Sequence, residues 1–360
     1  MTRIVLEKLT KLFGNFTAVK DLSLEVKDNE FLGLLGPSGC GKSTILYCIA
    51  GLESPTSGKI HFDGKEVNAL APEERGVGLV FQNYALFLHM AVYDNLAFSM
   101  KMKGADASQI RTEVKAMADY LQISGLLDRR ASTLSLPQMQ KVALGRTLLS
   151  HPKVLLLDEP LSALDAQSRQ LMRAELKRLQ KEVGQTAIFV THDQQEAMAL
   201  SDRVAVMNGG RLQHLGRPEE IYGHPPNTFV ASFIGSPQIN LINGTVQKKN
   251  GKLIIDADDW SFEIGQMNHH VKLNESQRVQ VGVRPEHVAV HENSGRSTGS
   301  RGTVFLLEPL GSEVILHIRV GRQTLKAISE KEIPSGKSVH LDFDEERLLF
   351  FDKDSGQAIV

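Results

Sequence analysis

A glycine-rich loop near the start of the chain has the residue types and spacing that hold a polyphosphate. It fits the pattern G-x-x-x-x-G-K-[ST], and it lies between apolar runs over residues 31–35 and 45–50, which predicts strand, loop and helix. Glycines let successive backbone N–H groups turn toward an anion, and the following helix directs its positive end at the same point. Lys42 would reach the β- and γ-phosphates, and the Ser43 hydroxyl would ligate Mg²⁺. The predicted phosphate-binding residues are Gly36, Pro37, Ser38, Gly39, Cys40, Gly41, Lys42, Ser43 and Thr44.

Two acidic residues follow a second apolar run. Residues 154–157 are the continuous apolar stretch that a buried parallel strand needs, and Asp158 and Glu159 come directly after them. We expect this strand to neighbour the strand before the phosphate loop, which would place Asp158 where Mg²⁺ coordination is completed. Glu159 could then polarise a water molecule that attacks the γ-phosphate. The chemistry predicted by these motifs is hydrolysis of a nucleoside triphosphate.

The elements that must position these residues change character along the chain. Apolar runs of strand length alternate with helical patterns up to about residue 236, which indicates a mostly parallel sheet covered by helices. Beyond that point short strands are separated by turns, as in a small antiparallel barrel or sandwich. We therefore predict an α/β domain over 1–236, with a helical subdomain at about 88–150, and an all-β domain over 237–360.

Composition limits the classes of function. The chain has 360 residues, and 41 Lys and Arg nearly balance 42 Asp and Glu, so a nucleic acid is not the expected partner. Cys40 and Cys48 are the only cysteines, which is typical of a reducing cytosol and not of a disulfide framework. No apolar run approaches the roughly eighteen residues that span a bilayer, so we expect a soluble chain that reaches the membrane only through a partner.

The motifs of residues 1–236 resemble, in their order, those of the nucleotide-binding subunit of an ABC transporter, a P-loop NTPase of the RecA-like fold. Three short segments carry the resemblance beside the loop and the acidic pair: Val80-Phe81-Gln82, Ser162-Ala163-Leu164-Asp165 and Val190-Thr191-His192-Asp193. The resemblance implies that Gln82 senses Mg²⁺ and the membrane partner, that Asp165 lies at a dimer seam, and that His192 contacts the γ-phosphate. It also implies that Phe13 stacks on adenine, and that Lys42, Glu159 and His192 are the catalytic residues.

One motif departs from the family pattern. The family's signature is Leu-Ser-Gly-Gly-Gln, whose Ser and Gln would here be Ser135 and Gln138 and would complete the site of the opposite subunit. Between them stand Leu136, which is bulky, and Pro137, which has no N–H to donate. Ser135 and Gln138 keep the spacing of a capping box, so a helix should still begin here. We expect ATP to bind and its turnover to be slowed.

Segments of the tail resemble the importers for maltose, other sugars and glycerol 3-phosphate. They are residues 229–237, 283–287 and 349–352, and in those importers the C-terminal domain is an oligonucleotide/oligosaccharide-binding-type (OB) barrel that strengthens the dimer. The resemblance implies ATP and Mg²⁺ as cofactors and a place on the cytoplasmic face of the inner membrane. It implies as partners two transmembrane permease subunits, a second nucleotide-binding subunit in a homodimer and, indirectly, an extracytoplasmic solute-binding protein.

The sequence leaves rival functions open. The chain could be a regulatory subunit, or one half of a heterodimer, that binds ATP and hardly hydrolyses it. Leu136 and Pro137 favour that hypothesis, whereas Glu159 and His192 favour hydrolysis. A translation-type or repair-type cassette is a third hypothesis, disfavoured by the single cassette, the predicted β-rich tail and the near-zero net charge.

Overall fold

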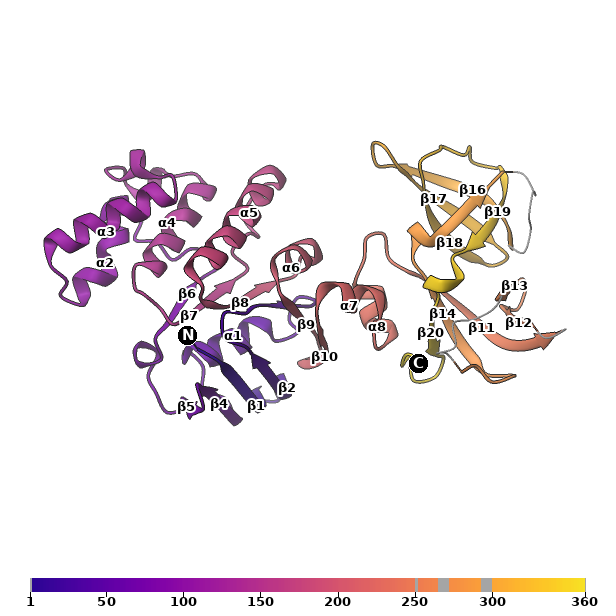
Figure 1. Cartoon of the computed structure of the whole chain (residues 1–360), viewed down its shortest axis with the longest axis horizontal. Coiled ribbons are helices and arrows are strands. Elements are labelled where there is room, and N and C mark those ends of the chain that lie inside the picture. Colours follow the sequence, from indigo (N-terminus) through magenta and orange to yellow (C-terminus); the bar gives the residue numbers. More distant parts are fainter. Residues whose placement is uncertain (1, 250–251, 265–271, 293–299, 360) are drawn as a thin grey trace. The chain divides into compact units, whose positions relative to one another are not determined.

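The computed structural model describes residues 2–249, 252–264, 272–292 and 300–359. Its contacts divide the chain into two compact units, Met1–Pro218 and Glu219–Val360, here called unit 1 and unit 2 (Figure 1). Among the described residues, no helix is long and apolar enough to cross a membrane.

Unit 1 alternates strands and helices as predicted. Its helices are α1 (Lys42–Ala50), α2 (Val92–Met102), α3 (Ala107–Tyr120), α4 (Leu136–Leu148), α5 (Ala166–Val183) and α6 (Gln194–Leu200). Its strands are β1 (Ile4–Phe13), β2 (Phe16–Val26), β3 (Phe31–Leu35), β4 (Ser57–Phe62), β5 (Lys65–Glu66), β6 (Val77–Val80), β7 (Val154–Asp158), β8 (Thr186–Thr191), β9 (Arg203–Asn208) and β10 (Arg211–Gly216).

A six-stranded sheet in the order β10-β9-β3-β8-β7-β6 forms the centre of unit 1. Neighbouring strands within this sheet pair in parallel, except β9 and β10, which pair antiparallel. Alternate residues of each strand face opposite layers. Leu156 and Ile188 pack with α1 and the β1–β2 hairpin, whereas Leu155 and Phe189 pack with α5 and the helical region. Burial on both faces explains why β7 and β8 read as continuous apolar runs.

The predicted neighbour relation of the acidic strand is wrong. The strand that ends in Asp158 is β7, and β8 lies between it and β3, the strand before the phosphate loop. An apolar run identifies a buried strand, but it carries no information about strand order. All three strands are parallel, so their carboxyl ends nevertheless meet at one edge of the sheet.

Two smaller groups of elements complete unit 1. The strands β2-β1-β4-β5 form a second, antiparallel sheet. Helices α2, α3 and α4 lie grouped together at one end of the unit (Figure 1), within the predicted helical region. Their apolar side chains, such as Leu96, Val114 and Leu144, are fully or almost fully buried in one cluster.

Unit 2 is rich in antiparallel strands, as predicted for the tail. One sheet has the order β13-β12-β11-β14-β20 and the other the order β15-β19-β16-β17-β18, with a shared apolar core. The elements are α7 (Pro218–Gly223), α8 (Thr228–Phe233), β11 (Asn240–Lys249), β12 (Lys252–Asp256), β13 (Ser261–Ile264), β14 (Arg278–Val283), β15 (Val288–His291), β16 (Ser300–Pro309), β17 (Val314–Val320), β18 (Gln323–Ser329), β19 (Ser338–Phe343) and β20 (Leu349–Asp352).

The division between the units falls earlier than the predicted boundary after residue 236. The short helix α8 packs on the tail strands, because Ala231 forms one buried cluster with Ile239 and Phe351. The Arg284 guanidinium, at the end of β14, also donates hydrogen bonds to the carbonyl oxygens of Tyr222 and Ala231. Side-chain packing of this kind is not visible in the strand and helix periodicity on which the predicted boundary rested.

The central sheet provides the first prediction. Leu156→Ala would leave a cavity beneath α1, since this side chain is fully buried, and should destabilise the protein by about 2–5 kcal/mol. Leu171→Ala on α5 is the matched control, because Leu171 is 66% exposed and its loss should change stability by less than about 0.5 kcal/mol. Thermal unfolding of both variants measures the difference, and equal shifts would contradict the placement of Leu156 in the core.

Candidate active site

The phosphate loop is pressed against the ends of two strands. A Cβ atom on Gly36 would lie 2.3 Å from the carbonyl oxygen of Met207, and one on Gly41 would lie 2.2 Å from that of Ala18. Gly41 also has a φ of 99°, a conformation that side chains disfavour. It is the N-cap of α1, and no side chain caps that helix end. The first-turn N–H groups are therefore open to an anion.

Lys42 is held inside this loop. Its Nζ donates hydrogen bonds to the carbonyl oxygens of Gly36 (2.8 Å) and Pro37 (2.9 Å), and only 5% of the residue is exposed. Neither partner carries a charge. A buried ammonium with carbonyl partners, beside open helix amides, favours binding of a negatively charged group.

The hydroxyl and carboxylate predicted to ligate Mg²⁺ lie together. Ser43 Oγ donates a hydrogen bond to Asp158 Oδ1 at 2.8 Å, from the first turn of α1 to the end of β7. The second carboxylate oxygen, Oδ2, accepts a hydrogen bond from the Tyr47 hydroxyl at 2.8 Å. Both oxygens of Asp158 thus receive donors from α1, which fixes the orientation of the carboxylate.

Tyr47 is a site residue that the sequence reasoning missed. Burial and the hydrogen bond to Asp158 raise the pKa of Tyr47 to about 12, so its hydroxyl stays protonated and donates at neutral pH. Its ring lies 6.4 Å from that of Phe81, the residue before Gln82. The available signal was spacing, because Tyr47 follows Ser43 by four residues on one helix and therefore shares its face.

Glu159, His192 and Gln82 form a second group. Glu159 Oε2 lies 3.2 Å from His192 Nδ1 and accepts a hydrogen bond from Gln82 Nε2 at 3.4 Å. Glu159 has a φ of 43°, a strained conformation for a residue with a side chain, and its N–H donates to the carbonyl oxygen of Val190 at 3.0 Å. Such strain persists where surrounding contacts enforce it, often at functional sites.

A polar network holds the segment that carries His192. Asp193 caps α6 by accepting hydrogen bonds from the N–H groups of Gln195 and Glu196. Thr191 Oγ1 donates to Glu196 and accepts from the Asp193 N–H, and Arg169 of α5 lies 3.4 Å from Asp193. Burial raises the pKa of Glu196. The motif predicted only His192, whereas the contacts from α5 and α6 that orient it come from the tertiary structure.

The remaining predicted residues lie apart from these two groups. Gln138 Oε1 accepts from the N–H of Ser135 at 3.0 Å, so the expected helix start forms, and Asp165 caps α5 by accepting from the Ser168 N–H. Phe13 is 45% exposed at the end of β1, with Lys11 Nζ 4.7 Å from its ring centroid. Among the described residues, Phe13, Ser135 and Gln138 share no hydrogen bond with the phosphate loop or the acidic pair. Their roles toward a nucleotide stay predictions.

Comparisons with known proteins match this chain to ABC transporter proteins. A family model described as "ABC transporter" matches residues 19–162, one described as "MalK OB fold domain" matches 235–288, and one described as "TOBE domain" matches 281–351. The chain is 43% identical to a trehalose/maltose import ATP-binding protein of Thermococcus litoralis, covering 100% of both chains. It is 42% identical to an sn-glycerol-3-phosphate import ATP-binding protein of Escherichia coli, with the same coverage.

A solved structure supports the fold of unit 1. The structure of cbiO1 from Clostridium perfringens, described as part of the ABC transporter complex cbiONQ, matches with a TM-score of 0.57 and 32% identity. The match covers 61% of this chain and 89% of that one. The α/β fold with a P-loop, followed by a β-rich OB-type region, is therefore confirmed.

The loop geometry yields a second prediction. Gly41→Ala should weaken ATP binding by about tenfold or more, because the new Cβ collides with Ala18 and forces the loop away from its strand ends. Gly64→Ala is the matched control, since Gly64 has a φ of 79° and open space around its Cβ position. Titration with a fluorescent ATP analogue measures both affinities, and an unchanged affinity in Gly41→Ala would contradict the tight seating of the loop.

Proposed function

Since this chain belongs to the family of ABC transporter ATP-binding subunits, we propose that it energises an importer for a sugar or for glycerol 3-phosphate. The observation that carries the proposal is the full-length similarity to import subunits, which includes the β-rich unit as well as the ATP-binding unit. The family's subunits are ATPases whose hydrolysis is coupled to transport, and this chain is an ATPase of that type.

We propose specific roles for the residues brought together in unit 1. The amides of the phosphate loop and Lys42 hold the β- and γ-phosphates of ATP. Glu159 accepts a proton from the attacking water, and its contact with His192 orients both side chains at the carboxyl ends of β7 and β8. Gln82 lies within hydrogen-bond reach of Glu159 and could report the state of the site to a membrane partner.

The donor set at Asp158 fits Mg²⁺. A hydroxyl and a carboxylate oxygen, 2.8 Å apart at the edge of the phosphate loop, are the hard oxygen ligands that this ion prefers. Ser43 and Asp158 would hold it, with Gln82 nearby as a further ligand proposed from the resemblance. Mg²⁺ bound there would neutralise charge that develops on the phosphates.

The proposed assembly follows from the similarity to importer subunits. We propose a dimer of nucleotide-binding subunits at the cytoplasmic face of the inner membrane, bound to two permease subunits that receive substrate from a solute-binding protein. The import functions of these two relatives, trehalose/maltose and sn-glycerol 3-phosphate, differ in the charge of the substrate. The transported molecule is therefore proposed only as a polyhydroxylated compound of this kind.

The residues at the start of α4 favour an ATPase whose turnover is slowed. Leu136 is the first residue of the helix and is 46% exposed, and Pro137 follows it. A nucleotide held by an opposing subunit would meet a bulky side chain and one amide fewer at this helix end. Loss of one donor to a transition state typically slows an enzyme by ~100- to 1000-fold.

The same observation favours a second candidate function. A chain whose signature poorly completes the ATP site of the opposite subunit could bind ATP and serve as the less active half of a heterodimer. In that arrangement its Glu159 and His192 would act on ATP completed by an intact signature from the other subunit, while its own signature would serve the partner's weaker site.

The third prediction tests the weakened signature on which both of these functions rest. The double variant Leu136→Gly with Pro137→Gly restores an open helix start with its amide, and it should raise steady-state ATP hydrolysis by about tenfold or more. The control is Glu159→Gln in both backgrounds, which should abolish turnover and so show that the measured activity belongs to this site. Equal rates of hydrolysis in the natural chain and the double variant would contradict the proposal that Leu136 and Pro137 slow turnover.

The fourth prediction concerns Tyr47. Tyr47→Phe removes one of the two hydroxyl donors that orient Asp158, and it should raise the Mg²⁺ concentration for half-maximal hydrolysis by about three- to tenfold. Tyr93→Phe is the matched control, because the Tyr93 ring lies near Lys101 on α2, away from this carboxylate. Magnesium titration of ATPase activity checks the prediction, which fails if both variants respond like the natural chain.

A further inference from the structure

Unit 2 contains a cleft with a volume of about 610 Å³. It is formed by the end of α7 with the following loop, by a short 3-10 turn (Glu345–Arg347), by β20 and by the last described residues of the chain. All of its lining residues belong to unit 2. The volume lies within the range of small-molecule sites, roughly 300–1000 Å³.

The cleft has an apolar floor. Pro225, Leu348 and Phe350 line it and are buried. β20 is the edge strand of its sheet, and the chain end folds back over only part of it, with the Ile359 N–H donating to the carbonyl oxygen of Phe350 at 2.7 Å. The accessible lining of the cleft is more apolar than polar.

A buried cation lines the same cleft. Arg284 is 2% exposed, and its guanidinium lies 3.9 Å from the ring centroid of Tyr222. Its terminal nitrogens donate to carbonyl oxygens of the α7–α8 segment, while its Nε is buried with no hydrogen-bond partner among the described residues. Glu286, which interacts electrostatically with Arg284, accepts a hydrogen bond from the Tyr222 hydroxyl. Within the described ranges, no carboxylate therefore forms an ion pair with Arg284.

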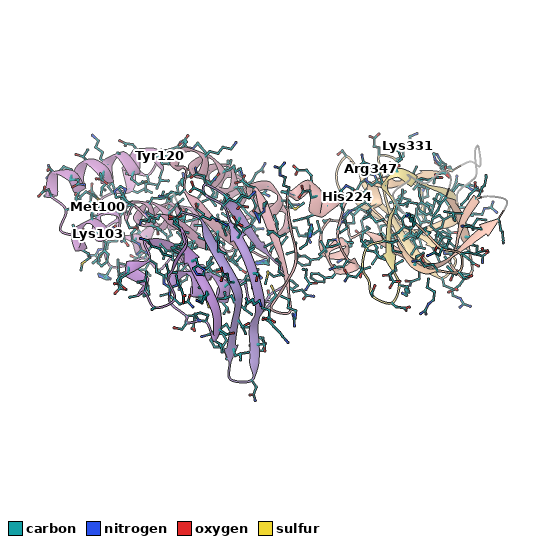
Figure 2. The ribbon with its side chains drawn as sticks, turned by 60° about the horizontal axis from the view of Figure 1, so that its bottom comes forward. Met100, Lys103, Tyr120, His224, Lys331 and Arg347 are labelled. Carbon is teal, nitrogen blue, oxygen red and sulfur yellow. The ribbon has the colours of Figure 1, made fainter. Side chains whose placement is uncertain are left out.

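Further basic groups stand at the rim. His224, His287 and Arg347 line the cleft, and within the described part of the chain their side chains form no ion pair. Figure 2 labels His224 and Arg347, which come from different segments of unit 2. Two acids, Glu345 and Glu346, also line the cleft, and solvent screens their charge as it screens that of the equally exposed Arg347, so the buried Arg284 is the least screened charge of the cleft.

We propose that this cleft binds a small, freely soluble organic anion with an apolar body. The apolar floor would take the body of the ligand, and the anionic group would lie toward Arg284 and the basic rim. An anion there would add negative charge beside a buried guanidinium whose electrostatic partner Glu286 forms no ion pair with it. The inference concerns unit 2 alone and goes beyond the proposed transport function, so its test does not depend on ATP turnover.

The experiment uses two fluorescent probes with the full-length protein in saturating ATP, so that the nucleotide site is occupied. 8-Anilinonaphthalene-1-sulfonate is an apolar anion, and N-phenyl-1-naphthylamine has the same ring system without the charge. We expect the anion to bind at one saturable site and to bind more tightly than the neutral probe. Equal affinities would overturn the assignment of an anion.

Three variants locate the site. Gly223→Trp should abolish binding of both probes, since a Cβ on this lining residue meets nothing within 4 Å and the ring can fill the cleft. The double variant Arg347→Gln with His224→Gln should weaken binding of the anionic probe by about three- to tenfold and leave the affinity of the neutral probe unchanged. Lys331→Gln is the control, because Lys331 is an exposed basic residue of unit 2 outside the cleft (Figure 2) and should change neither affinity.

Two outcomes would contradict the proposal. Probe binding that survives in Gly223→Trp, with thermal unfolding unchanged, would place the probes elsewhere. Sedimentation with phosphatidylglycerol vesicles distinguishes a membrane-borne anion from a free one. Co-sedimentation that is lost in Arg347→Gln would mean that the cleft binds lipid headgroups, and would overturn its assignment to a freely soluble ligand.

Discussion

The hydrogen bond between Ser43 and Asp158 joins the parts of unit 1 that chemistry requires to be close. It spans from the first turn of α1 to the end of β7, across the intervening strand β8. The bond can form only because β3, β8 and β7 are parallel and end at one edge, and because the phosphate loop is seated tightly against Met207 and Ala18. The sheet order, the two glycines and the apolar faces of the strands all serve this one placement.

Strain and its compensation are concentrated at the same edge. Glu159 adopts a positive φ, which costs about 1–2 kcal/mol for a residue with a side chain. Its backbone bond to Val190 and the network of Thr191, Asp193 and Glu196 hold the neighbouring segment in place. Rigid support from α5 and α6 therefore maintains the contact between Glu159 and His192, the pair to which we assign activation of water.

In unit 2, one buried residue, Arg284, both holds segments together and carries a charge beside the cleft. Arg284 fastens the α7–α8 segment to the tail strands through carbonyl oxygens, and in doing so it leaves a buried positive charge beside an apolar cleft. Arg284 thus explains why the structural division falls at the start of α7, and it also makes the cleft suited to an anion. This dual role ties the architecture of the unit to its proposed binding chemistry.

The sequence by itself determined the phosphate loop, the acidic pair, the alternation of strands and helices and the β-rich tail, because each rests on local spacing or on short-range periodicity. Gly41, Lys42 and Asp158 could be named in this way. Tertiary structure alone decided that β8 separates β7 from β3, that Tyr47 donates to Asp158, and that Arg169 supports the His192 segment. It also decided the position of Arg284 against α8. These relations join residues distant in sequence or depend on side-chain direction, and a linear pattern carries no record of either.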